Sequence, residues 1–234
     1  MMARSVYLPE WSKVSTNRLL RSVYEWMMIG LLVSGFSALA TAHSPFMLHL
    51  LFGNPWTIWI LIFVELALVV ALSAGIDKMD VSTARVLFIL FSIIDGMTLS
   101  SIFLVFTETS IASAFFISAL TFGVMSLYGY FTDADLSSWG TILIAGLIGV
   151  IIAMVINFFL HSPTIEWWID IIGVIIFVGL TAYDTQKIKQ MGEELAGGDP
   201  RAINRAAIVG ALALYLDFIN LFIMFLDIFG NRRE

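Results

Sequence analysis

Acidic side chains interrupt the apolar stretches of this sequence at four places where an ionised group is costly. The last such stretch, ALALYLDFINLFIMFLDIFG, carries Asp217 and, one helical turn later, Asn220. Earlier stretches carry Asp184 in GLTAYDTQKI, Asp95 in FSIIDGMTLS and Glu65 in LIFVELALVV. No lysine or arginine lies comparably deep in these stretches. Carboxyl groups in such places hold a proton, share one or bind a cation. The four acids, together with Asn220, are therefore the candidate functional residues.

The composition identifies the solvent that surrounds these side chains. Hydrophobic residues make up 59% of the 234 residues, charged residues only 13%, and the mean hydropathy is +0.93. A soluble domain has about 25% charged residues. The chain is therefore predicted to be an all-α membrane protein. The absence of cysteine excludes disulfides and thiolate chemistry, and no block of like charges indicates binding to nucleic acid.

Seven stretches are long enough to cross a bilayer as helices, which takes about twenty apolar residues each. They are residues 23–42, 56–76, 86–106, 110–131, 139–160, 165–184 and 206–229. We therefore expect a cytoplasmic N-terminal tail over 1–22, a seven-helix transmembrane domain over 23–230 and a C-terminal tail over 231–234. The first stretch exceeds the roughly 7–15 apolar residues of a signal peptide, so we interpret it as a retained helix.

Basic residues favour a cytoplasmic N-terminus. With seven crossings, ten of the twelve lysine and arginine residues fall on the N-terminal side of the membrane. Only Arg232 and Arg233 fall on the opposite side. A last segment that turned back near Asp217 would remove this exception. However, residues 211–229 contain no glycine or proline, which predicts one continuous helix.

Each acidic residue also has a purely structural interpretation. Asp184 lies three residues before Lys187, so the two side chains could pair in the headgroup layer. Glu65 and Asp95 could be protonated and hydrogen-bonded to a neighbouring helix. A rise of about 1.5 Å per residue places Glu65, Asp95 and Asp217 at a similar depth near the middle of the membrane. Asp184 is expected nearer the cytoplasmic end of its helix.

Two motifs resemble those of a known family. GVIIFVGLTAYDTQKIKQM, at residues 173–191, resembles the signature of the Bax inhibitor-1 family, also called the transmembrane Bax-inhibitor-motif family. LALYLDFINLFIMFL, at residues 212–226, resembles that family's last core helix. The seven-segment layout is similar along essentially the whole chain. The resemblance implies a seven-helix bundle with a central last helix, and a function as a pH-sensitive cation (calcium) leak channel or transporter.

The resemblance also implies roles for individual residues. The two motif aspartates, here Asp184 and Asp217, share a proton and control opening in that family, and they are expected to act as transient Ca²⁺ ligands when deprotonated. Glu65 matches an acidic position on the family's second helix. In some members a basic residue further along that helix engages the aspartates, whereas here the nearest base is Lys78, in the loop segment SAGIDKM. No cofactor is implied, and Ca²⁺ is the expected permeant ion.

Two other classes of function compete with this interpretation. Intramembrane aspartyl proteases also carry YD on one helix and aspartate on the next, but with GxGD where this chain has LYLD, and HExxH and GxSxG are absent. We therefore expect no enzymatic activity. A non-conducting regulator that binds other membrane proteins or a membrane protease stays open, because the family is linked to control of cell death and to membrane-protein proteolysis. The short termini favour a bacterial inner membrane.

Overall fold

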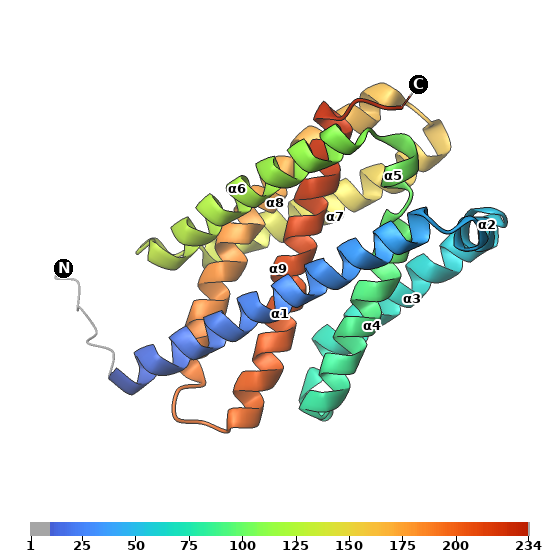
Figure 1. Ribbon diagram of the computed structural model, residues 1–234. Coiled ribbons are helices and arrows are strands. Elements are labelled where there is room, and N and C mark those ends of the chain that lie inside the picture. Colours follow the sequence, from blue (N-terminus) through green and yellow to red (C-terminus); the bar gives the residue numbers. More distant parts are fainter. Residues whose placement is uncertain (1–9, 234) are drawn as a thin grey trace.

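The computed structural model describes residues 10–233, which form a bundle of helices (Figure 1). Seven helices in this range are long and apolar enough to cross a membrane, which confirms the predicted all-α membrane fold and the number of spans. They are α1 (Glu10–Ala42), α3 (Pro55–Ala74), α4 (Val81–Leu99) with its short continuation α5 (Ile102–Val105), α6 (Glu108–Phe131), α7 (Ser137–Leu160), α8 (Pro163–Glu194) and α9 (Pro200–Phe229). The short helix α2 (Pro45–Phe52) and the 3₁₀ turn η1 (Ile76–Lys78) lie in two of the connections.

Four helices begin with the same local signal, a polar capping residue followed by proline. The four pairs are Ser44–Pro45, Asn54–Pro55, Ser162–Pro163 and Asp199–Pro200. Each capping side chain accepts a hydrogen bond from a backbone N–H in the first turn. Proline fits the first turn because the N–H that it lacks has no partner inside the helix. The starts of α2, α3, α8 and α9 are thus encoded locally.

Several helices extend beyond the predicted spans, because hydropathy detects only the apolar part of a helix. The helix α1 begins at Glu10 instead of near residue 23, and α9 begins at Pro200 instead of near residue 206. The helix α8 continues to Glu194, so Asp184 lies ten residues inside it. Ten residues correspond to about 15 Å of helix. Asp184 is therefore an interior residue of its helix, whereas the predicted span ends at residue 184. The predicted division into tails and a transmembrane domain stays a prediction, and residues 1–9 and 234 lie outside the described part of the chain.

The third predicted span, 86–106, is not one continuous helix. The helix α4 ends just before Ser100 and Ser101, and α5 begins just after them. The hydroxyl of Ser100 donates to the carbonyl oxygen of Met97 at 2.6 Å, and that of Ser101 donates to the carbonyl oxygen of Thr98 at 3.2 Å. Such side-chain bonds compete with the helical hydrogen-bond pattern. The span is interrupted near its end for this local reason.

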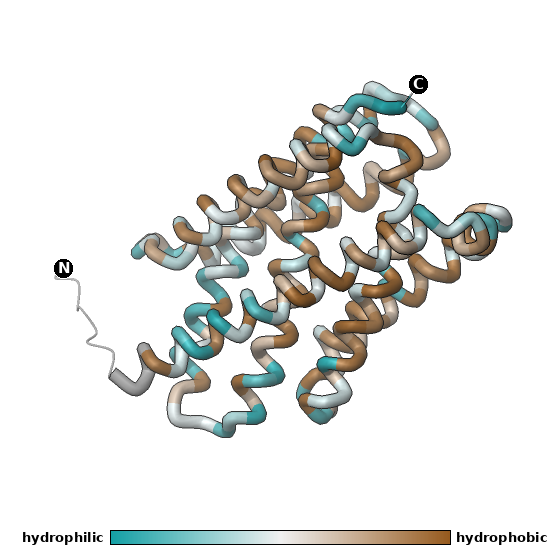
Figure 2. The backbone as a smooth tube through the Cα atoms, viewed as in Figure 1, coloured by the Kyte–Doolittle hydropathy of each residue, from teal (hydrophilic) through white to brown (hydrophobic). Residues whose placement is uncertain are grey.

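The helix α9 is the most buried of the seven spans. In an apolar stretch of 18 residues taken from each helix, 67% of the residues of α9 are buried, compared with 44% in α8, 11% in α3 and 6% in α7. It packs against α1, α3, α4, α6 and α8, and Figure 1 shows it passing behind α1. Figure 2 shows that hydrophobic residues run along the outer helices. An apolar outer surface is what a protein surrounded by lipid requires.

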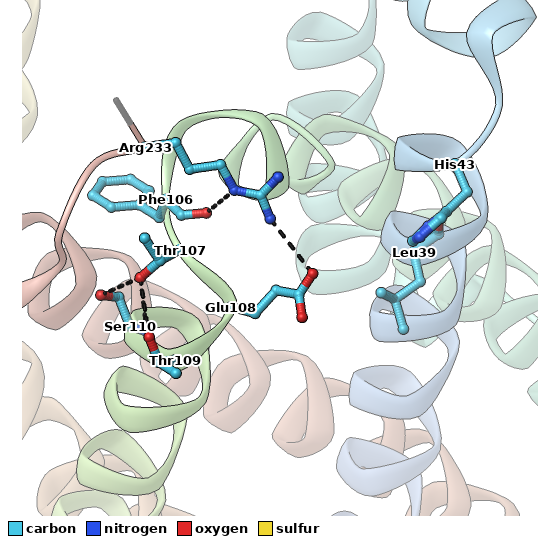
Figure 3. Close-up of polar contacts among 8 residues, drawn as sticks. All are labelled: Leu39, His43, Phe106, Thr107, Glu108, Thr109, Ser110 and Arg233. Atoms are coloured by element: carbon cyan, nitrogen blue, oxygen red, sulfur yellow. Dashed lines mark hydrogen bonds and ion pairs between the residues drawn. The ribbon is translucent and has the colours of Figure 1, made fainter.

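The helix α9 ends at the opposite end of the bundle from the start of α1 (Figure 1). At the N-terminal end, Nη1 of Arg205 donates to the carbonyl oxygen of Asp77 at 3.1 Å and links α9 to η1. At the other end, Nε of Arg233 donates to the carbonyl oxygen of Phe106 at 2.9 Å, and its guanidinium lies 3.6 Å from Glu108 (Figure 3). Arg232 forms a 3.9 Å ion pair with Glu166. The two arginines that oppose the charge count are therefore both paired with carboxylates.

Candidate functional site

Asp184, Asp217 and Asn220 line one pocket of about 430 Å³. Asp184 comes from α8 and the other two residues from α9, while α3 and α7 contribute apolar side chains such as Leu66 and Leu147. Asp217 is only 4% exposed, and Asp184 is half-buried. The two carboxyl groups interact electrostatically. Asp184 and Asp217, called the aspartate pair below, thus belong to a single site.

One atom of this site has no partner. Oδ2 of Asp217 is fully buried and accepts no hydrogen bond from any residue between 10 and 233. A buried polar atom without a partner costs about 1–3 kcal/mol, and most such atoms in folded proteins are paired. Asn220 does not bond to it, and one N–H of its Nδ2 donates to the carbonyl oxygen of Leu216 at 2.7 Å on the same helix. Asp217, which lines the pocket, therefore keeps one acceptor atom that no residue of the described chain uses.

The basic residue that lines the pocket is Lys187, one helical turn after Asp184. Its ammonium lies over the ring of Tyr183, 5.8 Å from the ring centre, and it interacts electrostatically with Asp184. Within the described part of the chain no salt bridge of 4 Å or less joins Lys187 to Asp184. The expected headgroup pairing is thus not a direct contact. Lys78 lies exposed in η1 and does not line the pocket.

The residues that flank Asp184 in the YDTQ motif fix α8 to its neighbours. The ring of Tyr183 lies against Gly140 of α7, where an added Cβ would come within 2.3 Å of the ring. The hydroxyl of Thr185 forms a 3.0 Å hydrogen bond with that of Ser126 on α6. With 3.6 residues per turn, successive side chains point to different neighbours. Asp184 is therefore held in its place by contacts on other sides of the helix.

Gln186 completes this set of contacts. Its Nε2 donates to the carbonyl oxygen of Ala134 at 2.8 Å, and its Oε1 accepts from the backbone N–H of Leu136 at 2.9 Å. These two bonds connect α8 to the loop between α6 and α7. This role of Gln186 was not predicted, although the residue belongs to the YDTQ motif.

Asp95 and Glu65 form a second polar group away from the pocket. The hydroxyl of Tyr215 donates to Asp95 Oδ2 and is also hydrogen-bonded to the hydroxyl of Ser34. The hydroxyl of Thr98 donates to Glu65 Oε1 at 2.6 Å. The two carboxyl groups interact electrostatically. This group joins α1, α3, α4 and α9, which is the structural role expected of a hydrogen-bonded acid between helices.

The structure thus divides the five predicted residues into two groups. Asp184, Asp217 and Asn220 surround the pocket, whereas Glu65 and Asp95 belong to the second group. Tyr215 was not among the predicted residues. Its signal in the sequence is a tyrosine inside an apolar helix, because a buried phenol hydroxyl requires a hydrogen-bond partner.

The pocket offers few ligands to a metal ion. Between residues 10 and 233 no group of three or more His, Cys, Asp or Glu side chains is arranged to hold a metal. Ca²⁺ takes six to eight oxygen ligands, and two carboxylates supply at most about four. A Ca²⁺ ion at the aspartate pair would therefore keep part of its water.

Comparison with known proteins gives consistent matches over nearly the whole chain. The model of the family described as "Inhibitor of apoptosis-promoting Bax1" matches residues 16–234. The chain is 52% identical over 211 residues to the inner membrane protein YbhL of Escherichia coli strain K12, with 90% of each chain covered. It is 44% identical over 218 residues to an uncharacterized protein of Borreliella burgdorferi, covering 93% of this chain and 94% of the relative. An uncharacterized membrane protein of Streptococcus pyogenes is 35% identical over 224 residues, covering 94% and 96%.

Proposed function

Because the chain belongs to the Bax inhibitor-1 family of membrane proteins, we propose that it is a pH-sensitive cation channel or transporter through which Ca²⁺ leaks across the membrane. The observation that carries the proposal is the unpaired, buried Oδ2 of Asp217 in a pocket shared with Asp184. Such an atom opposes folding, and its presence on the most buried span indicates a role in binding or gating.

The aspartate pair supplies the pH sensitivity. Two adjacent carboxyl groups in a poorly solvated pocket cannot both ionise at low cost, so at lower pH they hold a proton and carry at most one negative charge. When that proton leaves, the two charges repel each other and attract Ca²⁺. One carboxyl group belongs to α8 and the other to α9, so their repulsion separates the two helices on the pocket side. The cation leak is expected to increase as the pH rises.

The proposal places the protein in a bacterial inner membrane with its N-terminus in the cytoplasm. The relative YbhL is named an inner membrane protein. Ten lysine and arginine residues fall on the N-terminal side, which supports this orientation. Arg232 and Arg233 are the two exceptions, and each lies within 4 Å of a carboxylate.

Ion flux by the purified protein in liposomes tests the proposal. Ca²⁺, Na⁺, K⁺ and H⁺ flux is measured over a range of pH for the wild type and for Asp184→Asn and Asp217→Asn. We expect each variant to lose the pH response, with Ca²⁺ flux changed by about tenfold or more, which corresponds to about 1.4 kcal/mol of altered charge interaction. Asp227→Asn is the matched control, since Asp227 lies on α9 but does not line the pocket. Unchanged flux and an unchanged pH response in both variants contradict the proposal.

The alternative, a non-conducting regulator of other membrane proteins, needs a separate test. The predicted tail over 1–22 includes part of α1, where Leu19 is fully buried. A deletion up to Arg21 would therefore damage the core, and the deletion should stop before Glu10. If the chain acts through its N-terminal segment, deleting residues 1–9 abolishes co-purification of partner proteins. A channel core keeps its flux after the same deletion.

A further inference from the structure

The pocket around the aspartate pair opens sideways onto the lipid-facing surface of the bundle. Its walls include side chains of α3 and α7 that are exposed in the isolated chain, namely Leu66 (56%), Ile151 (51%) and Met154 (40%). These two helices are also the least buried of the seven spans. In a bilayer such side chains contact acyl chains, because no water is present at that depth. A molecule dissolved in the membrane can therefore reach the pocket.

The lining combines a large apolar surface with a few polar groups. The polar groups are those of Asp184, Asp217, Asn220, Lys187 and Tyr183, and every other side chain in the lining is apolar. Sites for small molecules have this composition and volumes of about 300–1,000 Å³, a range that includes the 430 Å³ found here. A hydrated metal ion gains nothing from apolar walls, whereas the hydrocarbon part of an organic cation gains free energy by contacting them.

We infer that this pocket binds a lipophilic organic ammonium ion that enters from the bilayer. The hydrocarbon part lies against Leu66, Leu147 and Phe177, and an ammonium N–H donates to the carboxyl group of Asp217. A single positive charge matches an aspartate pair that keeps one of its protons. The inference rests on the proposed function, because the same pair is the charged group that cations reach there. An ammonium ion bound in the pocket blocks the leak.

Lys187 is a competitor for this site within the chain itself. Its ammonium lines the same pocket and interacts electrostatically with Asp184, yet it lies over the ring of Tyr183 and forms no salt bridge with either aspartate in the described structure. Because Lys187 makes no salt bridge with the aspartate pair, an external cation can take the place next to the single negative charge of the pair. Removing the charge of Lys187 therefore strengthens the binding of that cation.

Direct binding measurements test the inference without relying on flux. The protein is placed in phosphatidylcholine nanodiscs, and binding of dodecylamine with a dansyl group at its far end is measured against empty nanodiscs. We expect unlabelled dodecylamine to displace the probe and dodecanol, which has the same chain but no charge, to displace it poorly. Asp217→Asn and Asp184→Asn should weaken binding by about tenfold. Asp227→Asn should leave it unchanged, and Lys187→Gln should strengthen it about threefold.

A further variant excludes misfolding as the cause of lost binding. Leu147→Trp fills the pocket and keeps both aspartates, so it should weaken binding while the protein still elutes as the wild type does on size exclusion. The inference is overturned if dodecanol displaces the probe as well as dodecylamine does, or if Asp217→Asn and Leu147→Trp bind with wild-type affinity. Amine binding without any Ca²⁺ flux would reject the proposed function alone. Aspartate-dependent flux without amine binding would reject the inference alone.

Discussion

Polar side chains on the two sides of the α8–α9 pair differ in whether they are hydrogen-bonded to other helices. On the side packed against α1, α4 and α6, polar side chains are hydrogen-bonded across helices, as Tyr215 is to Asp95 and Ser34, and Thr185 is to Ser126. On the side that faces α3 and α7, the carboxyl group of Asp217 keeps an unpaired oxygen. We call these the packed side and the pocket side.

This difference suggests two roles for polar groups: those on the packed side hold the helices together, and those on the pocket side are free to bind a ligand. A hydrogen bond between helices stabilises the fold, whereas an unpaired buried acceptor destabilises it. Substitutions on the packed side should therefore reduce stability. Substitutions on the pocket side should change function and leave stability intact.

The largest effect is expected from Gly129→Leu on the packed side. A Cβ at Gly129 of α6 would come within 2.2 Å of the backbone oxygen of Ala182 on α8, so the two helices must separate. Overpacking of this kind costs about 1–3 kcal/mol or more. Gly149→Leu on α7 is the control, because nothing lies within 4 Å of its Cβ position. Thermal unfolding in detergent should show a large loss for the first variant only, and equal losses would contradict the proposed difference between the two sides.

Tyr215→Phe and Asp217→Asn compare the packed side with the pocket side within a single helix, α9. Tyr215→Phe removes the hydroxyl that Asp95 and Ser34 use, leaves a half-buried carboxyl group without its donor, and should cost about 2 kcal/mol. Asp217→Asn, two residues away, removes a charge that has no hydrogen-bond partner at Oδ2, so its stability should equal or exceed that of the wild type. Denaturation curves of both variants check this. A less stable Asp217→Asn would mean that the pocket side is structural.

A smaller effect is expected at Gln186. Gln186→Leu loses both hydrogen bonds to the loop at Ala134 and Leu136 and should cost about 1–2 kcal/mol. Gln190→Leu, one turn later and exposed, should change stability by less than about 0.5 kcal/mol. Thermal unfolding combined with limited proteolysis of the loop measures the difference. Similar values for both substitutions would show that the loop is not held by Gln186.

The smallest effect is expected at an acidic residue that belongs to neither the packed side nor the pocket side. Asp135 is fully exposed, and the hydrogen bond from Ser137 lowers the pKa of its carboxyl group. Because the folded pKa lies below the unfolded value of about 3.9, this contact stabilises the protein above that pH and its contribution is lost as the pH falls through the folded pKa. Asp135→Ala should slightly reduce the melting temperature at pH 6 and have no effect at the lowest pH that the protein tolerates. A constant difference at all pH values would contradict this.

The elements of the fold could be predicted better than their contacts. The seven apolar stretches correspond to the seven spans because bilayer thickness fixes the length of a crossing helix. The end of α8 could not be predicted, since the residues beyond 184 are polar and hydropathy does not detect a helix that continues past the apolar layer. The break between α4 and α5 was also missed, because it depends on how two serine hydroxyls bond to the backbone.

The candidate site was predicted in part. The positions of Asp184 and Asp217 in apolar motifs marked both residues as unusual, and the structure places them at one pocket. The sequence did not predict that Glu65 and Asp95 lie away from this pocket, because the depth of a residue along a helix does not specify which neighbouring helix its side chain faces. For the same reason, the sequence did not show that Lys187 lines the pocket or that Tyr215 is the partner of Asp95.

The seven membrane-spanning segments and the acids within them can thus be recognised in the sequence alone. Those properties follow from the apolar length of each segment and from the cost of burying charge, which are local. The packing of the helices, in contrast, is needed to show that Asp95 and Glu65 are hydrogen-bonded to hydroxyl groups and that Asp217 keeps an unpaired oxygen. Hydrogen bonding between helices depends on how each helix is rotated about its axis, and that rotation is set by the packing of all its neighbours.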